Sequence, residues 1–197
     1  MSALSLDTNA LERQVAKLRA GDRVLLSGTI YTARDAAHKR LFELLDAGKP
    51  LPFELRGVVI YYAGPTPGQQ GMAVGACGPT TAGRMDGFAP RLLDLGLTAM
   101  IGKGERNQAV VDAIVRNGVC YFAAVGGAGA LIARCIESVE VVAFDDLGCE
   151  SVKRMIVRDF PLTVAIDSKG NDLYKQGREA YEVKPQGERC VTAGINL

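Results

Sequence analysis

The chain has 197 residues, of which 48% are hydrophobic and 23% charged, a balance typical of one soluble globular domain with its own core. Its formal net charge of +1 gives no electrostatic reason to expect nucleic acid or an anionic membrane as a partner. No apolar run approaches the roughly 20 residues of a membrane span, and MSALSLDTNALERQ at the start lacks the pattern of a secretory signal, so we expect a cytoplasmic protein.

Helices are predicted where apolar residues recur every three or four positions, and strands where β-branched and apolar residues cluster. In the first half of the chain these patterns predict, in order, a helix over 9–20, a strand over 22–32, a helix over 34–50, a buried strand over 57–64 and part of a strand over 72–76. Asp7 or Thr8 can cap the first helix, because their side-chain oxygens accept from backbone N–H groups.

In the second half of the chain the same patterns predict that helices and strands continue to alternate. The elements, in order, are a helix near Pro90, a strand over 97–104, a helix over 108–118, a strand over 119–125, a glycine loop and small-residue helix over 126–136, a strand over 139–144, and two short strands and a turn over 151–171. In the helix over 108–118 we expect Val111, Ile114 and Val115 to point inward and Gly118 to end the helix.

Strands that alternate with helices argue for an α/β fold with partly parallel pairing. Both ends of the chain look more purely β, so we expect a three-layer β/β/α arrangement. We expect a single domain over 1–197, with a core over about 20–175 and a polar tail over 176–197.

The five cysteines are widely spaced, without a CxxC motif or a Cys/His cluster; they are Cys77, Cys120, Cys135, Cys149 and Cys190. An odd number without short spacings argues against a disulfide framework or a zinc site. It also argues against an iron–sulfur cluster held by this chain alone. We expect most of them to be reduced, partly buried small hydrophobes.

The stretch CGPTTAGRMD, residues 77–86, has the composition of an anion site. Pro79 suits the first position of a helix, which would leave the N–H groups of residues 80–82 free to face an anion. The threonine hydroxyls add donors and acceptors, and the guanidinium of Arg84 matches a carboxylate. The alternative interpretation is an ordinary capped helix with a solvated arginine.

Two further basic residues follow predicted strands. In TARDAAH the i,i+4 spacing lets Arg34 and His38 share a helix face beside Asp35, and His38 can either titrate near neutrality or serve as surface or structure. Lys103 lies between two glycines in IGKG, where it can approach an anion. VGGAGAL (125–131) lacks the G-x-G-x-x-G order of a dinucleotide loop, so its glycines indicate tight packing.

Ligands gather at strand carboxyl ends in open α/β sheets, and three basic residues are predicted there. No nucleophile elbow, P-loop or metal-ligand set accompanies them. We interpret the chain as the anion-binding part of a larger site.

Five segments taken together resemble the β subunit of iron–sulfur-dependent class I fumarases and of the related L-tartrate dehydratases. They are GTIYTARDAAHKR, IYYAGP, CGPTTAGRMD, IGKG and DFPLTVAIDSKGNDLY. The resemblance covers about residues 20–175, and its most specific feature is T-x-R-D-x-x-H followed by G-P-T-T-x-x-R-M. The stretch over 148–174 looks more like fumarase β subunits than like tartrate dehydratase β subunits. The alternatives are an L(+)-tartrate dehydratase β subunit and a non-catalytic anion-binding module.

The resemblance implies a fold similar to the swivelling β/β/α domain of aconitase-like hydro-lyases. It also implies a partner α subunit, in a hetero-oligomer, whose three cysteines hold a [4Fe–4S] cluster with one iron open to substrate as a Lewis acid. Single-chain members carry this domain fused at their C-terminal side, so a chain of this length implies the two-subunit arrangement. The family reaction is the reversible trans addition of water to fumarate, a C4 dicarboxylate, giving (S)-malate.

The family's substrate-binding positions match a short set of residues here. These are Arg34, Thr80, Thr81, Ala82, Gly83, Arg84 and Lys103. Thr80 matches the threonine to which the family assigns proton transfer, and because a hydroxyl is a weak base it needs a stronger group, which the resemblance places as an aspartate on the α part. Asp35 and His38 are supporting candidates.

Overall fold

Four parallel strands form the centre of the sheet. The computed structural model describes residues 3–182. Strands β2 (Arg23–Thr32), β3 (Val59–Tyr61), β4 (Ala99–Gly102) and β5 (Cys120–Ala123) pair in that order, each parallel to the next. This confirms the α/β class and the partly parallel pairing that the alternating pattern predicts.

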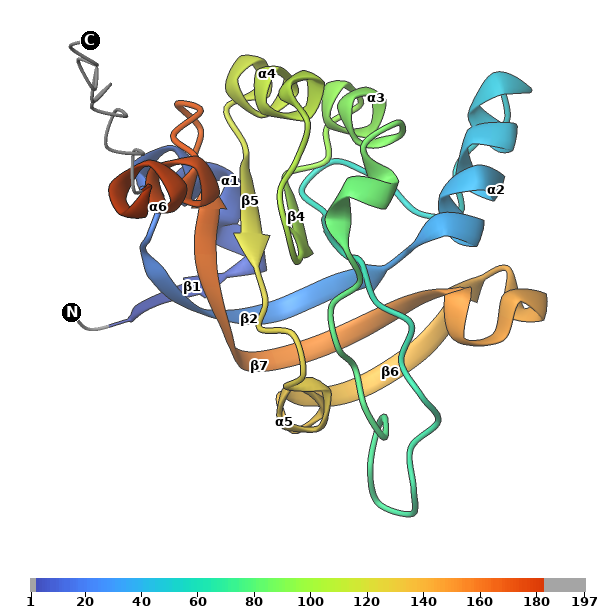
Figure 1. Ribbon diagram of the computed structural model, residues 1–197. Coiled ribbons are helices and arrows are strands. Elements are labelled where there is room, and N and C mark those ends of the chain that lie inside the picture. The colour runs from blue at the N-terminus through green and yellow to red at the C-terminus, as the bar shows by residue number, and fades with distance from the viewer. Residues whose placement is uncertain (1–2, 183–197) are drawn as a thin grey trace, which may run out of the picture.

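The long strand β7 (Val152–Ile166) closes this sheet into a barrel-like arrangement (Figure 1). It runs antiparallel to β5 on one side and to β2 on the other, so the strands form a ring. Strand β1 (Leu4–Asp7) extends the sheet beside β2, and β6 (Ile136–Ala143) pairs with β7.

Three helices cover the outer face of the parallel strands: α2 (Asp35–Asp46), α3 (Ala89–Asp94) and α4 (Gln108–Asn117). The remaining helical segments are short. They are η1 (Thr8–Ala10), α1 (Leu11–Gln14), η2 (Val15–Lys17), η3 (Ala82–Met85), α5 (Gly129–Ala133), η4 (Asp145–Glu150) and α6 (Leu173–Tyr181). No helix within residues 3–182 is long and apolar enough to cross a membrane.

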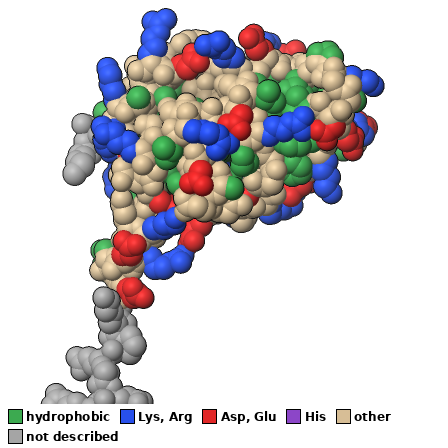
Figure 2. Space-filling view, turned by 90° about the horizontal axis from the view of Figure 1, so that it is seen from above, with side chains coloured by type: hydrophobic (Ala, Val, Ile, Leu, Met, Phe, Trp, Pro, Cys, Tyr) green, Lys and Arg blue, Asp and Glu red, His purple; other side chains and the backbone are tan. Residues whose placement is uncertain are grey.

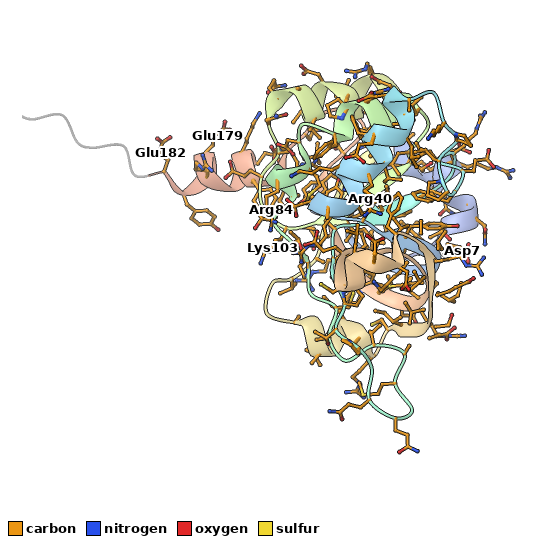
Figure 3. All side chains as sticks on the ribbon, turned by 90° about the vertical axis from the view of Figure 1, so that its right-hand side faces the viewer. Asp7, Arg40, Arg84, Lys103, Glu179 and Glu182 are labelled. Carbon is orange, nitrogen blue, oxygen red and sulfur yellow. The ribbon has the colours of Figure 1, made fainter. Side chains whose placement is uncertain are left out.

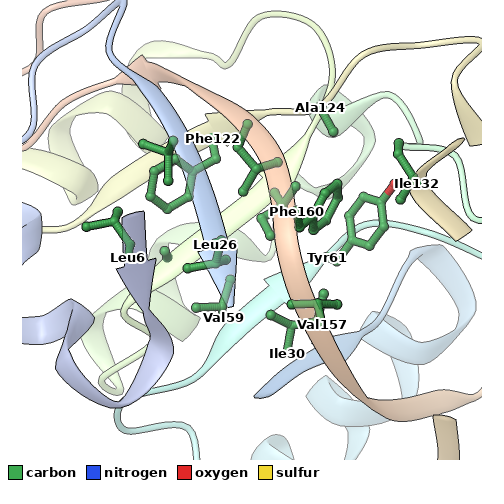
Figure 4. Close-up of a cluster of buried hydrophobic side chains, with 14 of the residues drawn as sticks. Leu6, Leu26, Ile30, Val59, Tyr61, Phe122, Ala124, Ile132, Val157 and Phe160 are labelled. Carbon is green, nitrogen blue, oxygen red and sulfur yellow. The ribbon is translucent and has the colours of Figure 1, made fainter. Parts of the chain in front are cut away.

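Alternating side chains along the short parallel strands fill two separate cores. In β3, Val59 and Tyr61 point into the barrel interior, where they meet Phe122 and Phe160 (Figure 4). Ile60, between them in the sequence, joins the second core under the helices. Successive residues of a strand face opposite sides, so a strand buried on both faces must be apolar throughout, as this one is.

The helical face carries charges of both signs, interspersed rather than gathered (Figure 2). Several of them pair across neighbouring helices, including Arg91 with Asp46 and Arg116 with Asp94. Water and salt screen exposed pairs of this kind, so the buried apolar face, rather than these pairs, holds the helices on the sheet.

Most predicted elements are confirmed, with shorter bounds. The helix predicted over 9–20 is a run of 3-10 and α turns over 8–17, held by the buried Leu11 and Val15 and capped by Asp7, whose side chain accepts from Asn9 N–H. Gly118 ends α4 in the left-handed conformation (φ 64°) that favours glycine, as predicted.

A turn follows at 168–169, within the predicted stretch 151–171, but the prediction of two short strands there is wrong, because a single strand spans Val152–Ile166. Asp159 marks a distortion within this strand. Asp159 has a φ of 50°, and the register with β2 shifts between Leu26 and Gly28 on the opposite strand. Such a bulge bends a strand without ending its pairing.

Two smaller predictions also fail. Residues 72–76 form no strand, and only Val74 makes a bridge, to Pro67, within the long loop between β3 and η3. Val115 is 44% exposed rather than directed inward, whereas Val111 and Ile114 are buried as predicted. The apolar stripe of α4 is therefore narrower than the sequence pattern indicates.

Candidate functional site

The parallel strands β2 to β5 end at one edge of the sheet, and the candidate residues follow those ends. Arg34 comes two residues after β2, Tyr62 directly after β3, Lys103 directly after β4 and Gly126 three residues after β5. Because neighbouring parallel strands present their carboxyl ends together, these segments lie side by side. The strand–loop–helix pattern in the sequence predicts this edge.

The Pro79–Ala82 segment fits between the ends of β3 and β4 as an extended chain. Thr80 N–H donates to the carbonyl of Tyr62 at 2.6 Å, and Ala82 N–H donates to the carbonyl of Lys103 at 2.8 Å. Lys103 N–H in turn donates to the carbonyl of Thr80 at 3.2 Å. These bonds bring Thr80 and Lys103 together, although 23 positions separate them in the sequence.

Two details of the predicted anion site are therefore wrong. Pro79 does not begin a helix, because it bridges Ala63 in the extended segment and the 3-10 turn η3 starts only at Ala82. The N–H groups of Thr80 and Ala82 are used by backbone carbonyls and do not face an anion. An anion at this edge would then be held chiefly by side chains, such as those of the two arginines and Lys103.

Gly102 allows the close approach of this segment to the sheet. A Cβ at that position would stand 3.0 Å from both Ala82 Cβ and Tyr62 Cδ2, closer than side chains normally pack. The glycine before Lys103, which the sequence suggests only as access to an anion, therefore serves packing.

Arg84 and Arg34 converge on Asp35. Arg84 donates from Nε to Asp35 Oδ1 at 2.9 Å and pairs from Nη2 with Oδ2 at 2.6 Å, while Arg34 Nε lies 3.9 Å from Oδ2. Asp35 thus occupies one side of the Arg84 fork and leaves the Nη1 end for another anion. Arg84 is 50% exposed, so the pair contributes at most about 1 kcal/mol and orients the guanidinium rather than locking it.

Glu150 is a site residue that the sequence does not reveal. Its Oε1 accepts from Arg34 Nη2 at 2.9 Å, and its Oε2 accepts from Ala36 N–H at 3.0 Å, which caps the start of α2. Arg34 and Glu150 are 116 positions apart in the sequence, and no motif links them. Only the closed sheet, which brings η4 beside α2, could have shown this contact.

Lys103 offers an ammonium without a partner, since no hydrogen bond or ion pair to its Nζ occurs within residues 3–182. Its side chain runs past Gly126, where a Cβ would stand 3.5 Å from Lys103 Cδ and 3.8 Å from Nζ. Lys103 and Arg84 extend from the same edge of the molecule (Figure 3). Thr80 is partly exposed there, and Thr81 and Gly83 are exposed.

His38 belongs to the interior and not to the surface. Its ring is fully buried, with Nδ1 3.0 Å from the carbonyl oxygen of Arg34 and with Tyr62 and Phe88 each at 5.5 Å between ring centroids. Burial lowers the pKa of His38 to about 4, against the smaller raising effect of the Arg34 carbonyl. The interpretation that His38 titrates near neutrality is therefore wrong, and at pH 7 it is a neutral structural group.

This burial makes His38 a source of acid sensitivity. Between pH 6.5 and 4 the unfolded chain binds a proton at His38 and the folded chain does not, so the free energy of unfolding falls as the pH falls. At pH 5 the loss is about 2 kcal/mol. We expect urea unfolding at pH 7 and pH 5 to show that loss in the wild type and not in His38→Leu. Equal pH dependence would mean that the folded protein admits the proton.

The described cysteines are free thiols. Cys77 and Cys120 are fully buried, deeper than the partial burial expected, and burial raises the pKa of Cys77 to about 12. Cys135 is partly buried and Cys149 is exposed, while Cys190 lies outside the described residues. Within residues 3–182 no three His, Cys, Asp or Glu side chains come together as a metal site.

We expect Cys135→Ser and Cys149→Ser to leave the free energy of unfolding within about 0.5 kcal/mol of the wild type, because Cys149 is exposed and Cys135 is only partly buried, and changes at such positions rarely cost more. Urea unfolding of the three proteins at pH 7 measures this. A larger loss in either variant would mean that its thiol contributes to packing.

Known proteins are similar to this chain in sequence. A family model described as "Fumarase C-terminus" matches residues 1–177. "Fumarate hydratase class I, anaerobic" from Escherichia coli (strain K12) is 42% identical over 165 residues, which is 83% of this chain and 30% of that protein. "Fumarate hydratase 2" from Leishmania major is 40% identical over 168 residues, 84% of this chain and 30% of that protein. The chain thus spans 30% of the length of these two relatives.

A third relative has a similar length. "Putative L(+)-tartrate dehydratase subunit beta" from Methanocaldococcus jannaschii is 39% identical over 178 residues, 87% of this chain and 91% of that protein. Since the family model matches nearly the whole chain and this relative aligns over nearly its full length, the chain belongs to the fumarase C-terminus family.

Proposed function

We propose that the chain is the β part of a hydro-lyase that reversibly hydrates fumarate to (S)-malate, and that it supplies the groups that bind the C4 dicarboxylate. The observation that carries the proposal is the meeting of Arg34, Thr80, Arg84 and Lys103 at one sheet edge. Relatives named fumarate hydratase, at 40% and 42% identity, support it.

The edge residues suit a substrate with two carboxylates. The outer Nη1 end of Arg84 can hold one carboxylate, because Asp35 occupies its other side. The ammonium of Lys103 can hold the second, and Arg34 adds positive charge beside Asp35. Ala82 and Gly83 shape the turn that presents Arg84, and the exposed Thr81 adds a hydroxyl.

Thr80 is the proposed proton-transferring group of this chain. Its Oγ1 sits on the segment fixed between β3 and β4, where it can give or take the proton at the substrate carbon. A threonine hydroxyl needs a stronger base to do this. His38 is buried and Asp35 is paired with Arg84, so we assign that base to the partner.

We also propose a partner α subunit that carries the [4Fe–4S] cluster. Two of the described thiols do not fit such a cluster, because Cys77 and Cys120 are buried in the core and protonated at neutral pH. The subunit-beta name of the Methanocaldococcus jannaschii relative supports a two-subunit assembly. For the fold we propose the swivelling β/β/α type, which the packing of α2, α3 and α4 on one face supports, and we propose a single domain over 1–197 in the cytoplasm.

The L(+)-tartrate dehydratase β subunit is the second candidate. The Methanocaldococcus jannaschii relative with that name favours it, because the alignment covers 91% of that protein. Both enzymes would bind a C4 dicarboxylate at the same edge. The substrate therefore has to be settled by assay.

The test is coexpression with a cysteine-bearing α subunit, followed by anaerobic assays on fumarate, (S)-malate and both tartrates. We expect turnover of fumarate and (S)-malate by the complex and none by this chain alone. Preference for a tartrate would select the second candidate. Turnover by this chain alone, reconstituted with iron and sulfide, would overturn the two-subunit proposal, and inactivity of the complex on all four acids would favour a non-catalytic anion-binding module.

A further inference from the structure

A buried ion pair joins the two segments that carry the proposed substrate-binding groups. Arg106 Nε donates to Asp86 Oδ1 at 2.6 Å, and the two side chains are 0% and 10% exposed. The other oxygen of Asp86 accepts from Asn107 N–H at 2.7 Å. Asp86 directly follows the turn with Arg84, whereas Arg106 and Asn107 belong to the loop that begins with Lys103. The pair therefore fastens the Lys103 loop to the Arg84 turn.

Tyrosines of the sheet hold the guanidinium of Arg106 in place. Its central carbon lies 5.4 Å from the ring centroid of Tyr62 and 5.0 Å from that of Tyr121, within the range of cation–π contacts. The carbonyl of Tyr62 accepts from Thr80 N–H at 2.6 Å, and the hydroxyl of Tyr121 donates to the carbonyl of Gly104 at 3.0 Å. Each tyrosine thus contacts both Arg106 and one of the two site segments.

We propose that Arg106 and Asp86 are positioning residues that fix the spacing between Arg84 and Lys103, so that both can engage one dicarboxylate. This rests on the proposed function, because the spacing matters only if one substrate bridges the two segments. Neither residue needs to touch substrate, since both are buried and act through the loop and the turn. A charged, doubly hydrogen-bonded carboxylate is a stiff link, and a shift of about 1 Å in a binding group can cost about 100-fold.

The proposal is tested with two variants in the assembled enzyme. Asp86→Asn keeps the shape of the side chain and removes the charge. The double variant Asp86→Asn with Arg106→Met removes both charges, so no unpaired charge stays buried and the fold should be retained even if the single variant is unstable. The matched control is Asp94→Asn, which removes the carboxylate from the 46–48% exposed pair with Arg116 on the helical face.

We expect both variants of the Arg106–Asp86 pair to raise KM for fumarate roughly 10- to 100-fold, with a smaller change in kcat. The control should leave both constants unchanged. We also expect amide hydrogen exchange of the full chain to speed up over 80–86 and 103–107, with the remaining strands unchanged. A double variant with wild-type KM would overturn the proposal. So would exchange that rises evenly through all strands, which is the result for a purely structural pair.

These outcomes separate this proposal from the function on which it rests. If the wild-type complex acts on none of the four acids, the proposed function fails. The exchange measurement still decides whether the Arg106–Asp86 pair holds the two segments together, because local loosening of these segments does not depend on any substrate. Unchanged amide exchange over 80–86 and 103–107 in both variants would by itself overturn the positioning role proposed for Arg106 and Asp86.

Discussion

Thr80→Val should lower kcat of the assembled enzyme by about 100-fold or more, with KM little changed. Valine has nearly the volume and the branching of threonine, and the extended backbone at Thr80 is held by main-chain bonds to Tyr62 and Lys103, so the substitution removes only the hydroxyl. A group that transfers a proton in the transition state contributes typically 10²- to 10⁴-fold to the rate. Loss in kcat without loss in KM is the mark of an interaction made in the transition state.

The control for this prediction is Thr80→Ser, which keeps the hydroxyl and should keep kcat within a few-fold. Steady-state kinetics in both directions, on fumarate and on (S)-malate, measure the effect. Wild-type kcat in Thr80→Val would remove Thr80 from the chemistry and leave it as part of the segment between β3 and β4.

Arg84→Lys should lower kcat/KM by about 10- to 150-fold, mainly through KM. Lysine keeps the charge but loses the planar fork, so it cannot hold Asp35 on one side and a substrate carboxylate on the other. A hydrogen bond to a charged group contributes roughly 1.5–3 kcal/mol, which sets this range. An arginine that binds ground state and transition state alike is expected to act on KM.

Arg34→Lys should behave in the same way, because Arg34 also approaches Asp35 and pairs with Glu150. The matched control is Arg91→Lys, at an exposed arginine paired with Asp46 on the helical face, which should leave both constants unchanged. Wild-type kinetics in both Arg84→Lys and Arg34→Lys would make these arginines surface residues and would move the dicarboxylate site elsewhere.

The sequence pattern was sufficient to find the parallel strands and the sheet edge at which the candidate residues lie. Strands β3 to β5 are short and largely apolar, β2 is rich in β-branched and apolar residues, and each is followed by a loop with a glycine or a basic residue; that local order places Arg34 and Lys103 at strand ends. The local sequence could not decide the conformation at Pro79, because a proline suits both the start of a helix and an extended segment at a sheet edge. The choice was made by bonds to Tyr62 and Lys103, which only the folded chain brings close.

The missed features all depend on contacts between distant parts of the chain. Glu150 reaches Arg34 only because the sheet closes, and the buried pair of Arg106 with Asp86 has no signal beyond ordinary charged residues in loops. The unbroken strand β7 was missed for a related reason, since Asp159 and Pro161 are typical turn residues. Pairing with β2 continues through this part of the strand, with Phe160 opposite Leu26 and Pro161 opposite Leu25, and keeps the strand continuous.

The position of β7 also bears on how the chain is made. One edge of β2 pairs with β7 from Arg23 opposite Thr163 to Thr32 opposite Lys153, while β1 and β3 use the other edge. A ribosome that adds about 5–20 residues per second finishes β7 on the order of ten seconds after β2. Throughout that interval the nascent chain exposes an unpaired strand edge, the kind of surface that invites pairing with the wrong chain. The yield of folded protein should therefore depend on how well that edge is shielded during translation.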